Sequence, residues 1–400
     1  MRILHTADWH LGQSLHGHDR GAEHDAFLSW LLDQVRRDEP HVVVIAGDVF
    51  DSSSPTSDAM ARYYRFLADC RRVHPDGQIV VVGGNHDSPH RLDAPVELLA
   101  PMRIHVVGSP GHDPERLIVP IGPQGAPVGY LLAVPYLRPS DLGRVTAEAG
   151  DRFIEGHRAF FQRVLDALPA NATQELPLVA TAHCFMAGGQ QSEESERPIQ
   201  RGNQSLLPLD VIPKRVDYLA LGHLHRAQRV SGAVHARYPG SPIPLSMTER
   251  DYAHQVLRVD LEAGAPAKVK SLHVPRAASM LAVPEVPAAP DAVIEALSAL
   301  EVPDDPVPPY LEVRVRLTEA APRLRQRIEE VLHDKRVRLT RIRVERTERA
   351  TGVAPHAEPL QDLAPVQVFR ELVAQARGAP PSRELESLFH RVVEEAEDEP

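Results

Sequence analysis

The sequence of 400 residues is short of several features, and each shortage excludes a class of protein. It has only two cysteines, Cys70 and Cys184, which are too few for a disulfide framework and fit a reducing cytosol. No apolar run approaches the ~20 residues that a membrane-spanning helix needs, and the first residues lack the layout of a signal peptide. The glycine-rich phosphate-binding loop of ATPases is also missing. We therefore expect a mature cytoplasmic protein with no ATP site of its own.

Positive charge is also scarce, because 44 Lys and Arg face 55 Asp and Glu for a net charge of −11. Affinity for DNA depends on basic side chains that neutralise phosphates, so this chain cannot coat DNA by bulk charge. A role on DNA requires a local basic surface, a dimer or a partner. Residues 314–349 are rich in arginine, and they fit either a DNA contact or a solvated face balanced by Glu329, Glu330 and Glu345.

What the sequence does contain is a set of five short apolar runs that each lead into metal-binding residue types. They are Arg2–Thr6 before Asp8 and His10, Val42–Ala46 before Asp48, Ile79–Val82 before Asn85, His86 and Asp87, Leu178–Ala182 before His183, and Tyr218–Leu221 before His223 and His225. Short β-branched runs bounded by glycine predict buried strands. Ligands just past strand ends can converge at one edge of a sheet.

Each motif alone has an ordinary structural explanation. Asp48 after a glycine is equally a turn residue or a helix cap, and a lone histidine such as His183 is usually just hydrogen-bonded. The joint occurrence of five such strand ends is what indicates a metal site. Asp, His and Asn together bind divalent transition metals.

The number of ligands favours two ions. Seven residues are available: Asp8, His10, Asp48, Asn85, His183, His223 and His225. A carboxylate can bridge two cations, and Asp48 is the candidate. Two ions can clamp a phosphoryl group and lower the pKa of a shared water to around 7. The absence of thiolate ligands disfavours a structural zinc site, and Mn, Fe, Co or Zn all fit.

Two neighbouring residues complete the predicted chemistry. His86 is left over beside Asn85, and it suits the role of general acid for the leaving oxygen or of electrostatic stabiliser of the transition state. Asp87 is a candidate to orient His86 or the adjacent backbone.

At this point the chain resembles a known family. The motifs DWH, GDVFD, GNHD, a lone H after a strand, and GHLH are similar to those of calcineurin-like metallophosphoesterases. The segments HTADWHLGQSLHGHDR, GDVFDSSSPTSDA, SEESERPIQRGNQSL and RYPGSPIPLSMTE resemble the bacterial SbcD branch of the Mre11-type nucleases, over residues 1 to about 261.

The resemblance implies a manganese-dependent DNA nuclease, a 3′–5′ exonuclease and single-strand endonuclease, that processes double-strand ends and hairpins with an SbcC-like coiled-coil ATPase. It implies one ion on Asp8, His10, Asp48 and His225, and a second ion on Asp48, Asn85, His183 and His223. His86 would be the catalytic histidine. The chain departs from archaeal relatives at Asp51, where those often carry a further histidine.

Composition predicts three regions. Residues 1–275 form the first, and the resemblance implies that it is the metallophosphoesterase unit, an α/β sandwich of two β-sheets flanked by helices. Residues 276–350 form a small α+β capping domain that touches DNA in the family, with a Pro-rich linker, Pro275–Pro309, around the helix Asp291–Leu300. The β-α-β pattern of Tyr310–Leu317, Pro322–His333 and Val337–Glu345 follows.

Residues 351–400 are predicted to be a linker and two helices, 365–377 and 382–395. Leu385, Leu388, Phe389 and Val392 lie on one side of the second helix, and they either pack on this chain or dock on the partner's coiled coil. Family resemblance also implies a homodimer within a heterotetramer. Its shared face would be Tyr63, Phe66, Leu67, Leu92, Val96 and Leu99, unless these residues simply cover the sheet.

Two other function classes compete. A metallophosphoesterase acting on cyclic nucleotides, phosphoproteins or dinucleotides would keep the same ligands, but the added α+β unit and helix pair speak against it. A metal-free scaffold would lack ligands, and none of the seven is missing.

Overall fold

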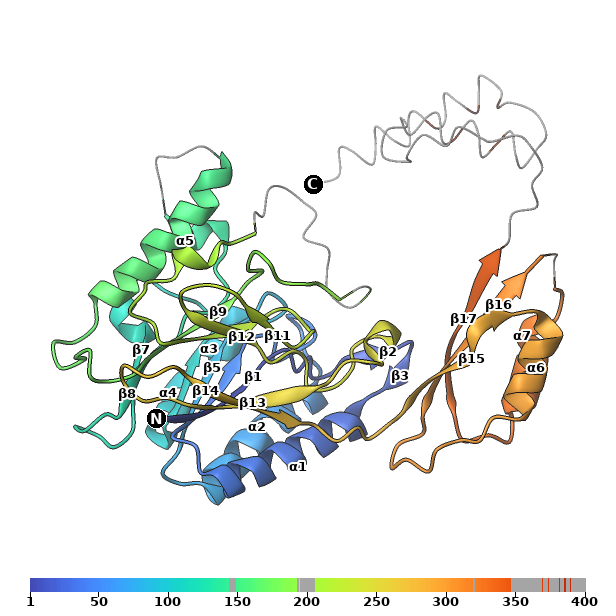
Figure 1. Cartoon of the computed structure of the whole chain (residues 1–400), viewed down its shortest axis with the longest axis horizontal. Coiled ribbons are helices and arrows are strands. Elements are labelled where there is room, and N and C mark those ends of the chain that lie inside the picture. Colours follow the sequence, from blue (N-terminus) through green and yellow to red (C-terminus); the bar gives the residue numbers. More distant parts are fainter. Residues whose placement is uncertain are drawn as a thin grey trace. The chain divides into compact units, whose positions relative to one another are not determined.

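The computed structural model describes residues 1–143, 149–192, 194, 206–318 and 321–346, and the single positions 369, 373, 381, 385 and 389. Its contacts divide the chain into two compact units, Met1–Glu345 and Arg346–Pro400. The first unit contains two six-stranded sheets, a three-stranded sheet and a two-stranded ribbon of β2 (Ser14–Leu15) and β3 (His18–Asp19) (Figure 1). In the part of the chain that the structure describes, no helix combines the length and apolarity of a membrane span.

The first sheet has the strand order β14-β13-β1-β4-β5-β6. Its strands are β1 (Arg2–Thr6), β4 (Val42–Ala46), β5 (Gln78–Val82), β6 (Ile104–Val107), β13 (Gln255–Asp260) and β14 (Lys268–His273). The strands β1, β4, β5 and β6 run parallel, so their carboxyl ends share one edge. Because β4 and β5 are buried along their whole length, their sequences are continuous apolar runs rather than alternating ones.

The second sheet has the strand order β11-β12-β10-β9-β8-β7. Its strands are β7 (Ile118–Ile121), β8 (Gly129–Leu132), β9 (Leu178–His183), β10 (Tyr218–Gly222), β11 (Gln228–Val230) and β12 (His235–Tyr238). Val44 and Val80 of the first sheet share one buried core cluster with Val179 and Leu219 of the second. The predicted α/β sandwich is confirmed, and all five predicted strands lie within one residue of their expected bounds.

Helices cover the outer faces of this sandwich. They are α1 (Gly21–Asp38), α2 (Ser57–Val73), α3 (Pro89–Asp93), α4 (Val96–Leu99) and α5 (Ala149–Asp166), with the 3₁₀ turns η1 (Ala100–Met102), η2 (Pro114–Leu117), η3 (Pro139–Leu142), η4 (Leu209–Val211) and η5 (Met247–Glu249). Phe27 of α1 and Phe66 of α2 are buried against Val43 and Val81 of the first sheet, whereas Phe161 of α5 joins the core of the second.

The side chains expected at a dimer face are buried within the protein itself. Tyr63, Phe66, Leu67, Leu92 and Leu99 belong to the core beneath the first sheet, and Val96 packs against the same cluster. They therefore cover the chain's own sheet, which is the alternative that the sequence left open. Leu98 is an exposed apolar residue of this region, with 78% of its surface accessible. The dimer itself stays a prediction.

The third sheet, β15-β16-β17, consists of β15 (Met280–Ala288), β16 (Tyr310–Leu317) and β17 (Arg338–Arg346). Its apolar side packs on α6 (Pro290–Ser298) and α7 (Leu324–Leu332) through a separate small core that includes Val293, Val313 and Ile328. The prediction of a linker over Pro275–Pro309 is wrong in one respect, because β15 occupies part of it. This edge strand tolerates Pro284 and Pro287, and its register with β16 shifts between Val283 and Ala288 where these prolines fall.

The second unit is described at only a few positions. Residues 369, 373, 385 and 389 are helical, and the rings of Phe369 and Phe389 stack with centroids 4.2 Å apart. The predicted linker 351–364 and the other residues of the predicted helices 365–377 and 382–395, including Leu388 and Val392, lie outside the described residues. Phe389 thus meets an aromatic residue of its own chain.

Candidate metal centre

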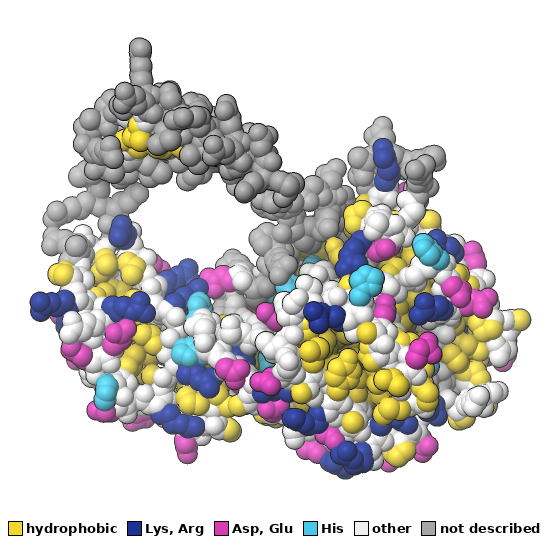
Figure 2. Space-filling model, turned by 180° about the vertical axis from the view of Figure 1, so that it is seen from behind, with side chains coloured by type: hydrophobic (Ala, Val, Ile, Leu, Met, Phe, Trp, Pro, Cys, Tyr) yellow, Lys and Arg dark blue, Asp and Glu magenta, His cyan; other side chains and the backbone are white. Residues whose placement is uncertain are grey.

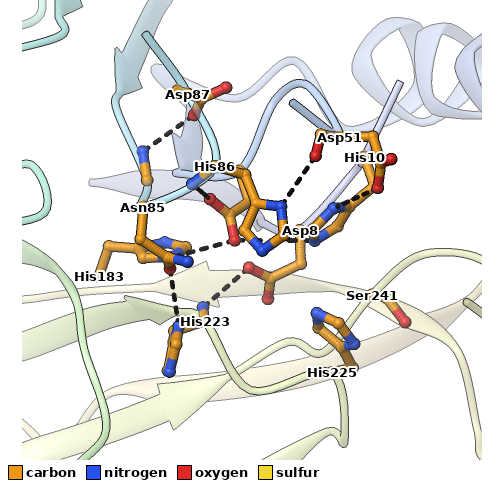
Figure 3. Close-up of polar contacts among 12 residues, drawn as sticks. Asp8, His10, Asp51, Asn85, His86, Asp87, His183, His223, His225 and Ser241 are labelled. Carbon is orange, nitrogen blue, oxygen red and sulfur yellow. Dashed lines mark hydrogen bonds and ion pairs between the residues drawn. The ribbon is translucent and has the colours of Figure 1, made fainter. Parts of the chain in front are cut away.

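The loops after five strands meet at one end of the sandwich, between the two sheets (Figure 3). Asp8 follows β1, Asp48 follows β4 and Asn85 follows β5, all at the shared carboxyl edge of the first sheet. His183 ends β9 and His223 follows β10, and these two parallel strands pair with His183 opposite Gly222. The topology therefore brings together residues that are up to 215 positions apart in sequence.

Two glycines allow the sheets to approach closely at this end. A Cβ on Gly222 would lie 1.9 Å from the carbonyl oxygen of Ala46, and one on Gly47 would lie 2.1 Å from Nδ1 of His183. Neither position can carry a side chain without separating the loops. The glycines that precede Asp48 and His223 in the sequence are therefore required by packing between the two sheets.

The backbone of the site is strained in the way that functional loops often are. Asp8, His10, Asp48 and His223 all have positive φ values, of 55°, 47°, 49° and 104°. Side chains rarely adopt this left-handed region, so the surrounding contacts must hold it. Asp8 N–H donates to the Gly47 carbonyl and His10 N–H to the Asp48 carbonyl, at 3.0 and 3.1 Å, which ties the first loop to the second.

Asp48 lies between two clusters of candidate ligands. Asp8, His10 and Asp48 form one cluster, and Asp48, His183 and His223 form the other, each with its ligand atoms within 4.8 Å of one another. Oδ2 of Asp48 is 3.7 Å from Nε2 of His10 and 3.2 Å from Nε2 of His183. The other oxygen, Oδ1, accepts a hydrogen bond from the His86 N–H at 2.9 Å. The Asp48 carboxylate is thus placed to serve both clusters.

Asn85 belongs to the second cluster by geometry. Its Oδ1 lies 3.0 Å from Nε2 of His183 and 2.9 Å from Nδ1 of His223. Figure 3 shows Asn85, His183 and His223 on one side of the site and His10 on the other, with Asp8 between them. A side-chain oxygen and two imidazole nitrogens therefore converge on one point together with Asp48.

The hydrogen bonds of the histidines fix which nitrogen faces the site. Nδ1 of His183 lies 2.9 Å from the Ala46 carbonyl, which can only accept, so this nitrogen must carry the proton. Nδ1 of His10 lies 3.2 Å from Oδ1 of Asp51 in the same manner. In both rings Nε2 can then hold a cation, which is the usual arrangement of metal-binding histidines.

Burial makes the charge state of the site unusual. Burial raises the pKa of Asp8 to about 7, and burial together with the charge on His183 lowers the pKa of His223 to about 3. Burial alone would raise the pKa of Asp48, but His183 holds it well below its usual range. In return the Asp48 carboxylate, acting against burial, raises the pKa of His183 to about 9. Positive charge is therefore favoured between Asp48 and His183.

The donor set fits divalent cations, and unsatisfied atoms support this. Oδ2 of Asp8 and Nε2 of His10 are buried and have no hydrogen-bond partner in the described structure. Leaving such atoms unpaired costs roughly 1–3 kcal/mol each. Both belong to one cluster, so a cation there would satisfy both at once. Carboxylate, amide and imidazole ligands suit Mn, Fe, Co or Zn.

His225 is placed differently from the other predicted ligands. It does not belong to any of the three compact clusters found among the described residues. Its ring is buried next to that of His10, with centroids 5.1 Å apart, and its Nδ1 lies 3.3 Å from Oε1 of Glu249. Glu249 is fully buried and was given no role from the sequence. The segment RYPGSPIPLSMTE contained it, but only the fold shows its contact with His225.

His86 lies at the rim of the site. Its Nδ1 donates to the Asp51 backbone carbonyl at 2.8 Å, which leaves Nε2 as the position for a mobile proton. Its ring is 4.8 Å from that of His10, and His10, Asp51 and His86 form the third compact cluster. Asp51, which sequence reasoning treated only as a departure from relatives, therefore positions two histidines at once.

Asp87 supports the backbone, and its carboxylate is directed at main-chain groups and not at the His86 ring. The carboxylate accepts from the N–H groups of Gly84, Val49 and Phe50 at 2.9, 3.1 and 2.9 Å. Burial raises its pKa to about 6. Asp87 thus fastens the loop after β4 to the loop after β5.

Comparisons with known proteins agree with this geometry. The profile of the calcineurin-like phosphoesterases matches residues 1–227, which is more than half of the chain. The chain belongs to the calcineurin-like phosphoesterase family. The profile of the type 5 capsule protein repressor C-terminal domain, an SbcD carboxyl-terminal module, matches residues 280–377.

Curated relatives place the chain in the SbcD branch of this family. It is 37% identical over 376 residues to the SbcD component of the nuclease SbcCD of Rhodobacter capsulatus, covering 91% of each chain. It is 34% identical over 399 residues to the SbcD component of Escherichia coli K12, covering 97% of each. The SbcD component of Bacillus subtilis is 36% identical over 276 residues, which is 67% of this chain and 68% of that one. The predicted family membership is confirmed over nearly the whole length.

Proposed function

We propose that this protein is the nuclease component of an SbcCD-like complex and hydrolyses phosphodiester bonds at DNA double-strand ends and hairpins. It would act as a 3′–5′ exonuclease and a single-strand endonuclease. The observation that carries the proposal is the pair of ligand clusters that share Asp48. The relatives that are SbcD components of the nuclease SbcCD support the substrate class.

In this proposal one divalent ion is held by Asp8, His10, Asp48 and His225, and the other by Asp48, Asn85, His183 and His223. Mn²⁺ is the expected ion. Two such ions would neutralise phosphate charge and lower the pKa of an attacking water. Asp48 connects the two ligand clusters. One of its oxygens faces His10 and His183, and the other is fixed by the His86 N–H.

His86 supplies the proton chemistry. Its Nδ1 is committed to the Asp51 carbonyl, so Nε2 can hold a proton and deliver it to the leaving oxygen. Asp51 fixes the ring plane and thereby the direction in which Nε2 points. The four strained loop residues keep these groups in place before substrate arrives, so the chemical step needs little rearrangement.

The three-stranded sheet with α6 and α7 is proposed as the DNA-contacting cap, but several of the arginines in this region are paired with acidic side chains. Arg325, Arg327, Arg336 and Arg341 each form an ion pair with a carboxylate. Figure 2 shows Lys and Arg side chains interspersed with Asp and Glu on the face that it displays. This pattern favours the solvated-face explanation for much of the stretch 314–349. Sequence-independent affinity for DNA is then expected to rest on the assembled complex.

The loop 187–206 contacts the cap at one described position. Oε2 of Glu194 pairs with Arg341 of β17 at 2.9 Å. Residues 193 and 195–205, including Arg197, lie outside the described residues. We also propose that this loop shapes the mouth of the substrate site.

The test is digestion of end-labelled duplex and hairpin DNA with Mn²⁺, with a cyclic nucleotide assayed in parallel. We expect cleavage of DNA by the wild type and no cleavage by the Asp48→Asn variant. Hydrolysis of the cyclic nucleotide without cleavage of DNA would instead support a phosphoesterase of other specificity. A protein that binds no Mn²⁺ would support the metal-free scaffold.

We also propose an SbcC-like coiled-coil ATPase as the partner of the carboxyl-terminal helices, within a heterotetramer built on a homodimer. Truncation after Pro359 should abolish association with the ATPase and leave Mn²⁺-dependent cleavage intact, because every proposed ligand lies at or before His225. Co-purification of the truncated chain with the ATPase would refute this assignment, as would its unfolding. Sedimentation showing only a 44.2 kDa species at micromolar concentration would refute the dimer.

A further inference from the structure

The buried carboxylate of Glu249 contacts one ring nitrogen of His225, Nδ1. Glu249 has no accessible surface, and its Oε1 is 3.3 Å from Nδ1 of His225. Its Oε2 accepts from the Leu245 N–H at 2.8 Å and from the Ser241 hydroxyl at 3.4 Å. Both oxygens thus have acceptor roles, and one of them is directed at the imidazole.

The segment from Gly240 to Glu249 is fitted closely over His225. Ser241 N–H donates to the His225 carbonyl at 3.0 Å, and a Cβ on Gly240 would lie 2.6 Å from that carbonyl oxygen. The other side of the segment is held as well, because the Leu245 carbonyl accepts from Nε2 of Gln13 at 2.8 Å. Glu249 is therefore presented to His225 by a backbone that is fixed at both ends.

We propose that Glu249 is a positioning residue that fixes the tautomer and the ring orientation of His225, so that Nε2 presents its lone pair to a divalent cation. The inference rests on the proposed function, in which His225 is a ligand. A carboxylate that accepts a hydrogen bond from the Nδ1–H group keeps the lone pair on Nε2 and increases the basicity of that nitrogen. Without this acceptor the buried ring could carry its proton on Nε2, and that form cannot bind a cation there.

A carboxylate that accepts from Nδ1 of a histidine occurs twice at this centre, and the two carboxylates differ in burial. Asp51 accepts from Nδ1 of His10, but its side chain is 41% exposed, so water can replace it. Glu249 is fully enclosed, so no water can take over its role. Of these two carboxylates, Glu249 is therefore expected to matter more for metal affinity.

Replacing Glu249 by glutamine tests the tautomer directly. A glutamine side chain has one acceptor oxygen and one donor group in place of two acceptors. The Leu245 N–H requires the oxygen, so the amide nitrogen must face Nδ1 of His225. That arrangement favours the proton on Nε2 and removes His225 as a ligand while the shape of the site is kept.

The experiment measures binding of Mn²⁺ alone to the full-length protein by calorimetry, together with the electron paramagnetic resonance spectrum of the loaded protein. We expect Glu249→Gln to weaken one of the two Mn²⁺ sites by roughly 10–100-fold, the usual effect of removing such a supporting group. The spectrum of a coupled Mn²⁺ pair should be replaced by that of a single ion. The control Asp251→Asn lies two residues beyond Glu249, and its side chain is 82% exposed, so both sites should keep their affinity.

The variant His225→Ala separates failure of this inference from failure of the proposed function. If His225→Ala loses one site but Glu249→Gln binds two Mn²⁺ as the wild type does, Glu249 is only structural and the inference is overturned. If His225→Ala itself keeps both sites, the ligand assignment is wrong and the inference falls with it. Should Glu249→Gln fail to fold, Glu249→Asp keeps a carboxylate at shorter reach. Intermediate affinity at one site would then support the inference, and unchanged affinity would refute it.

Discussion

Two buried polar clusters of this protein are similar in composition, but they differ in whether every buried polar atom has a hydrogen-bond partner. The first is the metal centre. The second, which we call the cap anchor, consists of Arg20, Glu23, Tyr310 and Arg338 where β16 and β17 meet the loop before α1. Both contain charged side chains that are almost completely buried, among them Asp48 in the metal centre and Arg20 and Glu23 in the cap anchor. Only the metal centre leaves buried atoms pointing at a shared point, Oδ2 of Asp8 and Nε2 of His10.

In the cap anchor the buried groups are matched to one another. Arg20 donates to Glu23 at 3.1 and 2.6 Å, to Oε1 of Gln13 at 2.8 Å and to the Pro244 carbonyl. The Tyr310 hydroxyl donates to Glu23 at 2.5 Å and accepts from Arg338 at 3.0 Å, while both guanidinium groups lie over the Tyr310 ring.

The comparison shows that burial and charge alone do not identify a ligand site. In the cap anchor Arg20 and Glu23 neutralise each other as an ion pair, and nothing about the cluster calls for a further cation. The carboxylates and imidazoles of the metal centre satisfy one another only in part, because Oδ2 of Asp8 and Nε2 of His10 have no hydrogen-bond partner. Unpaired atoms that converge are therefore the more informative feature, and each cluster should respond differently to loss of one member.

The largest effect is expected for Asp48→Asn. The His86 N–H requires an acceptor, so the amide oxygen of the new side chain should stay on that side. The amide nitrogen then faces Nε2 of His10 and of His183, where a cation would sit. We expect loss of bound Mn²⁺ at both sites and no detectable hydrolysis, measured by elemental analysis and by DNA digestion. Metal content and turnover near wild type would rule out Asp48 as the bridge.

His86→Ser should separate chemistry from binding within the same centre. His86 contacts the ligand clusters only at their rim, so both Mn²⁺ ions and DNA binding should be retained. Turnover should fall by roughly 10²–10⁴, the usual range for loss of a general acid. The matched comparison is His223→Ala, which should lose metal. If His86→Ser lost metal equally, His86 would be a ligand in the third cluster with His10 and Asp51.

A substitution in the cap anchor should lower the stability of the protein and leave its metal content unchanged. Glu23→Gln leaves the Arg20 guanidinium buried without its counter-charge, and breaking a buried pair in this way costs about 3–5 kcal/mol. We expect that loss in the free energy of unfolding by urea, while Mn²⁺ stoichiometry stays at two. The control Asp33→Asn breaks an exposed pair with Arg36 and should change stability by less than about 1 kcal/mol. Loss of an ion in Glu23→Gln would show that the two clusters are coupled.

The candidate metal ligands could be proposed from the sequence because each follows its strand at short range. Asp8, Asp48 and Asn85 are recognisable from the apolar run before them and the glycine or turn beside them. The cap anchor offers no such signal, since Glu23 and Tyr310 are 287 positions apart and only the fold joins them. The contact of Glu249 with His225 was also missed, because only the fold joins them, although they are just 24 positions apart. Strand β15 was missed because Pro284 and Pro287 are typical of a linker, although an edge strand tolerates them.

The smallest effect concerns His24, which lies between the two clusters. It hydrogen-bonds the backbone of Trp9 in the metal-site loop, and burial together with the charge on Arg20 lowers its pKa from 6.5 to about 3. The unfolded chain therefore binds a proton below pH 6.5 that the folded protein does not bind until about pH 3. Stability from this residue is complete above pH 6.5 and declines as the pH falls through this window.

The variant His24→Gln cannot take up that proton, so its unfolding free energy should fall less steeply than that of the wild type. The two slopes should differ by up to about 1.4 kcal/mol per pH unit between pH 6.5 and pH 5, measured by urea unfolding in the presence of a chelator. The control His333→Gln changes a histidine whose side chain is 83% exposed and should leave the slope as it is. Parallel slopes for His24→Gln and the wild type would mean that His24 already carries its proton in the folded state. A buried imidazolium cation would then lie between the two clusters, and they could no longer be treated as separate.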